Sequence, residues 1–222
     1  MNTPLTDSPA TDEALARRRA AIAALGHELR DLVDAAVRTT AADETLHQAL
    51  DDVRRLTAEL TVGQRAPAEI SPVDEFPGGL RMYSPVTGQG SPLAPPMEVV
   101  ADDACLVGRC VLGSAHEGPP GFAHGGMSAM LLDELMGHAC AAAGTPAMTI
   151  SLRLRYQGPV PLATPLRVVA RVVRTEGRKL HVDGSIATET APASALVAAD
   201  AVFVAPDPAR FHELFPCLPA TP

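Results

Sequence analysis

The strongly apolar segment 126–143 constrains the fold of this chain more than any other stretch. It follows a pair of glycines and ends before Gly144 and Pro146, residues that favour the termination of a helix. Leucine, methionine and alanine cover most of its circumference when it is placed on a helical wheel. The sequence therefore predicts one long helix here, buried on nearly all sides.

Strand-like runs lie on both sides of this predicted helix. Two runs precede it and turn at Asp102 and Asp103, and four follow it, each separated from the next by turn residues. The six runs span residues 99–101, 105–112, 148–156, 166–174, 180–189 and 195–204. Two strands, a buried helix and an antiparallel meander predict an α+β fold, with a sheet packed around one central helix.

The N-terminal part of the chain has a different pattern. Apolar residues recur at helical spacing through residues 11–60 with a break at 39–43, which predicts a helical hairpin. We interpret this hairpin as a structural or dimerising extension. The predicted organisation is a helical extension over 1–61, a linker rich in proline and glycine over 62–96, a sheet-and-helix domain over 97–208 and a tail over 209–222. Within the linker, one short strand is expected near residues 80–83.

Composition argues against several classes of function. The net charge of -8 disfavours a nucleic-acid partner, because neutralising phosphates requires a clustered basic surface. The four cysteines form no CxxC pair and the histidine spacing is irregular, so neither a metal site nor a redox pair is predicted. No long uncharged apolar run and no apolar leader occur, so we expect no membrane span and no signal peptide. These features predict a cytoplasmic protein with reduced thiols.

One carboxylate, Asp133, lies in the middle of a narrow stripe of small residues on the predicted central helix. The other members of the stripe are Gly126, Ala129, Gly137, Cys140 and Gly144. Burying an unpaired carboxylate is costly, so Asp133 is either hydrogen-bonded by a neighbouring strand or acts as a general base or nucleophile facing a cleft. Glu134 is the rival carboxylate, and its i to i+4 spacing from His138 favours a charge-paired position.

The start of the helix carries a second candidate feature. His124, Gly125 and Gly126 leave the first backbone N–H groups accessible, and these groups lie at the positive end of the helix dipole, where a developing oxyanion is stabilised. A glycine-rich helix start without a ligand has the same pattern. Gly125 and Asp133 are eight residues apart, which is about 12 Å along a helix. If both act on one carbonyl, they must come from two antiparallel helices, one from each subunit of a dimer.

At these residues the sequence resembles a known family. Phe-Ala-His-Gly-Gly at 122–126, followed by Leu-Leu-Asp-Glu at 131–134, is similar to the signature of PaaI-like hotdog acyl-CoA thioesterases, in the 4-hydroxybenzoyl-CoA thioesterase superfamily. Segments 147–162 and 175–179 resemble the thioesterase-superfamily-member branch of that superfamily. The resemblance covers residues 97–206, about half of the chain. It implies a hotdog fold, an antiparallel sheet wrapped around one long helix, in homodimers that often pair into homotetramers.

The resemblance also implies an activity, the hydrolysis of an acyl-CoA thioester to free acid and CoA. By position, Asp133 is the implied catalytic carboxylate and Gly125 the oxyanion donor, with Gly126 beside it. His124 is expected next to the thioester, and Thr149 is expected to help hold the attacking water. No cofactor is implied, because the CoA thioester is itself the substrate.

Substrate contacts are less well defined by the sequence. Some relatives place Asn or Gln about six residues before the motif histidine, and here either Glu117 takes that role or the backbone donors act alone. Met127 and Met130 suit either an aliphatic chain or an aryl ring, because methionine side chains adapt to both. Arg178 and Lys179 form either a docking point for a CoA phosphate or an ordinary solvated turn. A catalytically silent hotdog module that binds acyl-CoA or a related ligand is the alternative to an enzyme.

Overall fold

The computed structural model of the chain describes residues 9–67, 69–75 and 79–207. The first elements are α1 (Pro9–Arg38), α2 (Asp43–Leu60), β1 (Glu98–Asp102), β2 (Cys105–Val111) and the short 3-10 helix η1 (Ser114–His116). They are followed by α3 (Gly125–Ala142), β3 (Met148–Tyr156), β4 (Pro165–Glu176), β5 (Lys179–Thr188) and β6 (Val197–Val204). The predicted helical hairpin and central helix are confirmed, and the strand bounds differ from the predicted ones by at most two residues.

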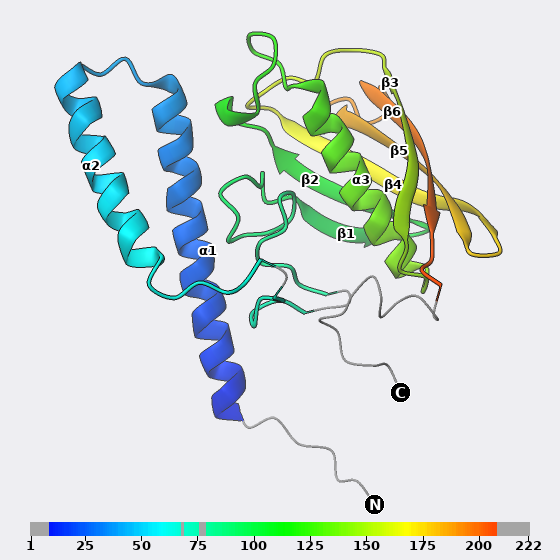
Figure 1. Cartoon of the computed structure of the whole chain (residues 1–222). Helices are drawn as coiled ribbons and strands as arrows, with labels where there is room; N and C mark the ends of the chain where they lie inside the picture. Colours follow the sequence, from blue (N-terminus) through cyan, green and yellow to red (C-terminus); the bar gives the residue numbers. More distant parts are fainter. Residues whose placement is uncertain (1–8, 68, 76–78, 208–222) are drawn as a thin grey trace, which may run out of the picture.

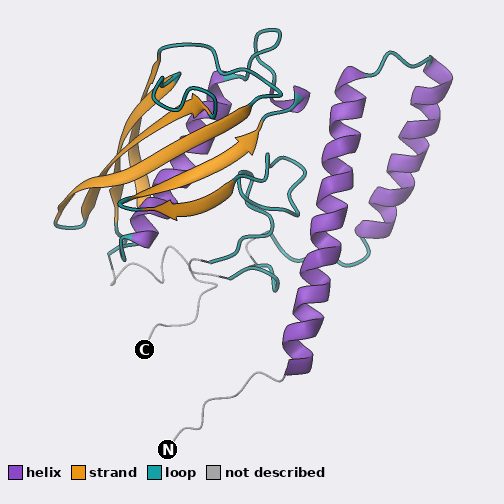
Figure 2. Cartoon of the chain, turned by 180° about the vertical axis from the view of Figure 1, so that it is seen from behind, coloured by secondary structure: helices purple, strands orange, loops and turns teal. Residues whose placement is uncertain are grey.

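The six strands form one antiparallel sheet in the order β1-β2-β4-β5-β6-β3. α3 lies across one face of this sheet (Figure 1), and the view from behind shows the strands curving around the helix (Figure 2). β1 and β3 are the two edge strands of the sheet. This arrangement confirms the predicted hotdog fold with two additional N-terminal helices.

The core lies between α3 and the inner face of the sheet. Along β4, Leu166, Val168 and Ala170 are fully buried and alternate with more exposed residues, as expected for a strand with one covered face. α3 contributes Leu132 and Met136, which are also fully buried. The helix can lie close to β5 because position 184 is a glycine. A Cβ atom at position 184 would lie 2.7 Å from Cε of Met136 and 3.0 Å from Cδ2 of Leu132.

The linker attaches α1 to the sheet domain. Gly26 permits a close backbone approach, since a Cβ atom at this position would lie 2.4 Å from the carbonyl oxygen of Gln89. Nη1 of Arg30 donates hydrogen bonds to the carbonyl oxygens of Gln89 and Ser91 at 2.8 Å and 2.9 Å. Ile22 is buried in a small apolar cluster with two residues of the linker. α1 is therefore fixed to the body of the molecule along one of its faces.

The expected short strand at residues 80–83 is wrong, because residues 80 and 81 are irregular and residues 82 and 83 form a turn. Two carboxylates accept hydrogen bonds from backbone N–H groups that would otherwise donate to a neighbouring strand. Oε2 of Glu75 accepts from the N–H of Leu80 at 3.1 Å, and Oδ1 of Asp74 accepts from the N–H of Met82 at 2.7 Å. The predicted tail over 209–222 lies outside the described residues.

Candidate active site

Asp133 on α3 faces the beginning of β3. The hydroxyl of Thr149 donates a hydrogen bond to Oδ1 of Asp133 at 2.7 Å. Both residues line a cavity of about 550 Å³, together with Gly137, Met148 and Phe203, and this volume is typical of ligand-binding pockets. The two interpretations of Asp133 are thus compatible, because the carboxylate accepts a hydrogen bond from a strand residue and also borders a cavity.

Glu134 lines the same cavity as Asp133 but has different hydrogen-bond partners. Its Oε1 accepts hydrogen bonds from the hydroxyls of Ser84 at 2.6 Å and Thr87 at 3.3 Å, and lies 3.6 Å from Nε2 of His138. The hydrogen bond from His138 lowers the pKa of Glu134 from its ordinary value, against the opposing effect of burial. A carboxylate held ionised by two hydroxyl donors and a neighbouring imidazole is a poor proton acceptor, so Glu134 is suited to anchoring the linker on α3.

The first turn of α3 is organised by His124, its N-cap residue. Nδ1 of His124 accepts a hydrogen bond from the N–H of Gly126 at 3.0 Å. The N–H of Gly126, which the sequence places beside the expected oxyanion donor, is thus paired with the His124 ring in this structure. In the part of the chain that the structure describes, the N–H of Gly125 has no hydrogen-bond partner. The structure leaves Gly125 as the available donor at the helix start.

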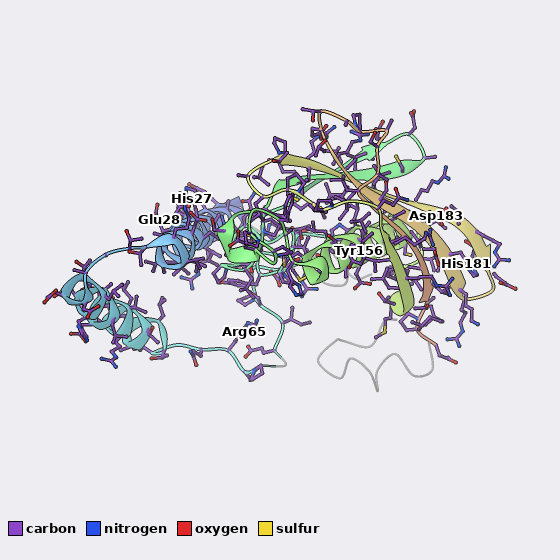
Figure 3. The ribbon with its side chains drawn as sticks, turned by 90° about the horizontal axis from the view of Figure 1, so that it is seen from above. His27, Glu28, Arg65, Tyr156, His181 and Asp183 are labelled. Atoms are coloured by element: carbon purple, nitrogen blue, oxygen red, sulfur yellow. The ribbon has the colours of Figure 1, made fainter. Side chains whose placement is uncertain are left out.

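Tyr156, the last residue of β3, is a functional candidate that the sequence did not identify. Its hydroxyl donates a hydrogen bond to the carbonyl oxygen of Gly125 at 2.9 Å. The peptide group between Gly125 and Gly126 is thus held at both ends, by Tyr156 at its oxygen and by His124 at its nitrogen. Tyr156 is 57% exposed, and Figure 3 shows it beside the ribbon of α3. No local pattern could have revealed this contact, because it joins residues 31 positions apart.

The three remaining residues near the helix start contribute to the loop and the core. Oε1 of Glu117 accepts a hydrogen bond from the N–H of Gly121 at 2.7 Å, and this bond closes the loop before α3. This carboxylate therefore stabilises the loop in the structure. Met127 and Met130 are half-buried and pack against the main apolar core. They do not line the cavity that contains Asp133.

The turn between β4 and β5 carries the two predicted cations. A guanidinium nitrogen of Arg178 donates to the carbonyl oxygen of Ala205 at 3.2 Å and lies 4.0 Å from Oδ2 of Asp207. Lys179 is opposite Val204 of β6, which is itself opposite Met148 of β3. Two strand spacings of about 4.8 Å each separate the backbones of Lys179 and Met148. The turn therefore lies at the same end of the sheet as Thr149 and the cavity.

The described residues offer no obvious alternative chemistry. Burial raises the pKa of the Cys110 thiol to about 12 and that of the Cys140 thiol to about 11, so neither is a ready nucleophile. Over residues 9–67, 69–75 and 79–207, no group of three or more His, Cys, Asp or Glu side chains is arranged to hold a metal ion. Within the same ranges, no helix has the length and apolar character needed to cross a membrane.

Comparisons with known proteins agree with this geometry. The family model described as "Thioesterase superfamily" matches residues 120–193, which include α3 and the strands β3 to β5. Over 70 residues the chain is 40% identical to the acyl-coenzyme A thioesterase THEM4 of Mus musculus, covering 32% of this chain and 30% of that protein. Over 69 residues it is 36% identical to the acyl-coenzyme A thioesterase THEM5 of Homo sapiens, covering 31% of this chain and 28% of that protein. The chain thus spans less than a third of the length of these curated relatives.

A solved structure matches a much larger part of the chain. The crystal structure of a thioesterase superfamily protein superposes with a TM-score of 0.72 and 30% sequence identity. The superposition covers 82% of this chain and 90% of that chain. Since the sheet domain makes up only about half of the sequence, the likeness extends into the N-terminal half. The chain belongs to the thioesterase superfamily.

Proposed function

We propose that this protein hydrolyses an acyl-CoA thioester to a free acid and CoA. The observation that carries the proposal is the Asp133 carboxylate, which borders a cavity and accepts a hydrogen bond from Thr149 at 2.7 Å. The names of the relatives THEM4 and THEM5, both acyl-coenzyme A thioesterases, support a CoA thioester as the substrate.

The proposed reaction uses Asp133 as a general base. The Thr149 hydroxyl donates its hydrogen bond to Oδ1 of the carboxylate. The other oxygen, Oδ2, accepts a proton from a water molecule. The water oxygen attacks the thioester carbonyl, and the oxyanion that forms accepts a hydrogen bond from the N–H of Gly125. The carbon–sulfur bond then breaks, and the proton held by Asp133 passes to the departing CoA sulfur.

We further propose that each active site is shared by two subunits. Asp133 and Gly125 lie about 12 Å apart along α3, too far to act on one carbonyl. β3 is an edge strand that exposes Met148 and Ile150, so its free side can pair with a second copy. Antiparallel pairing about Leu152, the middle residue of β3, brings Thr149 of one subunit opposite Arg155 of the partner subunit and next to the partner's Tyr156. Because Thr149 contacts Asp133 and Tyr156 contacts Gly125, this pairing supports a site with Asp133 from one chain and the partner subunit's Gly125.

Turnover on a panel of acyl-CoA thioesters tests the proposal. Acyl groups from acetyl to palmitoyl, together with aryl groups, are incubated with the purified full chain, and the release of CoA thiol is measured. Release from at least one member above the uncatalysed rate supports hydrolysis. Tight binding of acyl-CoA without release of thiol contradicts it and indicates a silent binding module.

Tyr156 is expected to position the oxyanion donor. Tyr156→Phe removes the hydrogen bond to Gly125 and keeps the aromatic ring, and one neutral hydrogen bond is worth about 1 kcal/mol. We expect kcat to fall roughly fivefold with KM unchanged, and the melting temperature to stay close to wild type because the side chain is exposed. Steady-state kinetics and thermal unfolding measure these effects. A KM increase with unchanged kcat would assign Tyr156 to substrate binding instead.

The turn with Arg178 and Lys179 is expected to recruit the CoA nucleotide. The net charge of the chain is -8, so an anionic coenzyme must be attracted locally rather than by the whole protein. Replacing both residues by alanine should raise KM for acyl-CoA and weaken its salt dependence, with kcat unchanged.

Two controls distinguish docking of the nucleotide from support of the fold. A short thioester without a nucleotide should be hydrolysed at the wild-type rate by this double variant. The matched variant Arg54→Ala/Arg55→Ala on α2 removes the same charge far from the sheet and should leave KM for acyl-CoA unchanged. Equal losses on both substrates would mean that the turn supports the fold.

A further inference from the structure

The second helix of the hairpin exposes a continuous apolar face. α2 contributes no buried residue, although five large apolar side chains recur on one side of it at helical spacing. These five residues, here called the α2 face, are Leu46, Leu50, Val53, Leu56 and Leu60. Each of them is between 41% and 56% exposed. Within one chain, the α2 face is only half covered.

α1 adds to this surface. Leu25 and Leu32 are 44% and 42% exposed and lie on the flank of α1, roughly a quarter of a turn from Ile22 and Gly26, which pack on the linker. α1 and α2 run antiparallel beside each other (Figures 1 and 2), and α2 is the element farthest from the sheet in the view from above (Figure 3). The hairpin therefore presents apolar residues from both helices at the periphery of the molecule.

The charged groups of α2 lie outside this face and pair with one another. Arg54 pairs with Asp51 at 3.3 Å, and Arg55 pairs with Asp52 at 3.6 Å and with Glu59 at 3.2 Å. Five acidic and two basic residues give α2 a net negative charge, whereas helices that bind membrane surfaces carry mainly lysine and arginine on their polar face. This composition favours a protein partner over a lipid surface.

The size and shape of the face fit a second copy of this chain. Full burial of a leucine or valine removes roughly 60–120 Å² of apolar surface at about 25 cal/mol per Å². Seven half-exposed side chains therefore offer roughly 300 Å² per chain, about 60% of the apolar share of a standard interface of about 800 Å² per partner. Two antiparallel hairpins related by a two-fold axis cover each other's faces as a four-helix bundle. An 18-residue helix is only marginally stable alone in water, so this packing also accounts for its stability.

We propose that the α1–α2 hairpin is a self-association surface, separate from the edge strand β3. α1 packs against η1, which follows β2, while β3 forms the opposite edge of the sheet. The two surfaces therefore lie on different sides of the subunit. Pairing through β3 produces a dimer, and pairing through the hairpins joins two such dimers into a tetramer.

Mass measurement by light scattering on the full chain tests the proposal. We expect four chains in the wild type and two in Leu50→Glu/Leu56→Glu, because paired carboxylates cannot be buried in the bundle. The control Gln48→Glu/Ala58→Glu adds the same charge to the polar side of α2 and should remain tetrameric. Turnover of acyl-CoA per chain should be equal in all three proteins, since none of these residues lies near Asp133. Circular dichroism verifies that helix content is retained.

Four further outcomes decide the remaining cases. Leu56→Ala preserves helix propensity, so it should give a tetramer that dissociates to dimers at a higher concentration than the wild type does. A wild-type dimer that Leu50→Glu/Leu56→Glu converts to a monomer would support the hairpin surface and contradict the pairing of β3. A wild-type mass that neither variant changes would overturn the proposal, as would a wild-type dimer that binds vesicles of anionic phospholipid through α2.

Discussion

Asp133→Asn is expected to lower kcat by about a hundred- to ten-thousand-fold, the range typical of general acid-base catalysis. The amide has the shape of the carboxylate, and its oxygen can still accept the hydrogen bond that Thr149 donates at 2.7 Å. It cannot accept a proton from water. Binding of acyl-CoA and the melting temperature should therefore stay close to wild type, as measured by calorimetry and thermal unfolding.

The neighbouring carboxylate supplies the matched control for this prediction. In Glu134→Gln, the amide oxygen can still accept the hydrogen bonds from Ser84 and Thr87, so kcat should remain within a few-fold of wild type. Loss of a charged hydrogen-bond acceptor is expected to reduce stability by about 1–3 kcal/mol. The reverse pattern, with kcat lost in Glu134→Gln and kept in Asp133→Asn, would make Glu134 the catalytic residue.

Two inactive variants should restore activity to each other when their subunits exchange. Gly125→Pro removes the proposed oxyanion donor, and proline is well tolerated at the first position of a helix. His124, the residue before it, has φ -61° and ψ 137°, a conformation that a following proline favours. The helix should therefore persist without its donor.

The expected gain follows from the composition of the mixed dimers. An equal mixture of Gly125→Pro and Asp133→Asn gives half of its dimers as hybrids, each with one intact and one doubly defective site. About a quarter of the wild-type activity should return if sites are shared between subunits. Subunit exchange is verified with differently tagged chains. Proven hybrids with no activity would contradict a shared site.

Local periodicity allowed much of this fold to be predicted from the sequence. The apolar run of α3 and the two-residue alternation of strands such as β4 depend on neighbouring residues, so a single sequence contains them. The stripe of small residues also identified Asp133 before any contact was known. Glu134 likewise lies near His138, as its i to i+4 spacing predicted.

Contacts between distant segments could not be predicted in this way. Ser84 lies 50 residues from Glu134, and Tyr156 lies 31 residues from Gly125. Both pairs meet only because the linker and β3 fold over α3. The hydrogen bond between His124 and Gly126 is local, but the glycines alone do not reveal that the His124 ring turns back onto the helix. The prediction of a strand at 80–83 was wrong because carboxylates of the linker accept hydrogen bonds from the backbone N–H groups of this segment.

The central claim is that Asp133 activates water for thioester hydrolysis, and a single comparison tests it most directly. The rate of CoA release is measured at saturating acyl-CoA for the wild type and for Asp133→Asn, with binding of the same acyl-CoA quantified in both. The account predicts turnover by the wild type, binding by both proteins, and a loss of at least a hundredfold in the variant. Equal rates of CoA release from two proteins that bind the substrate equally well would contradict it.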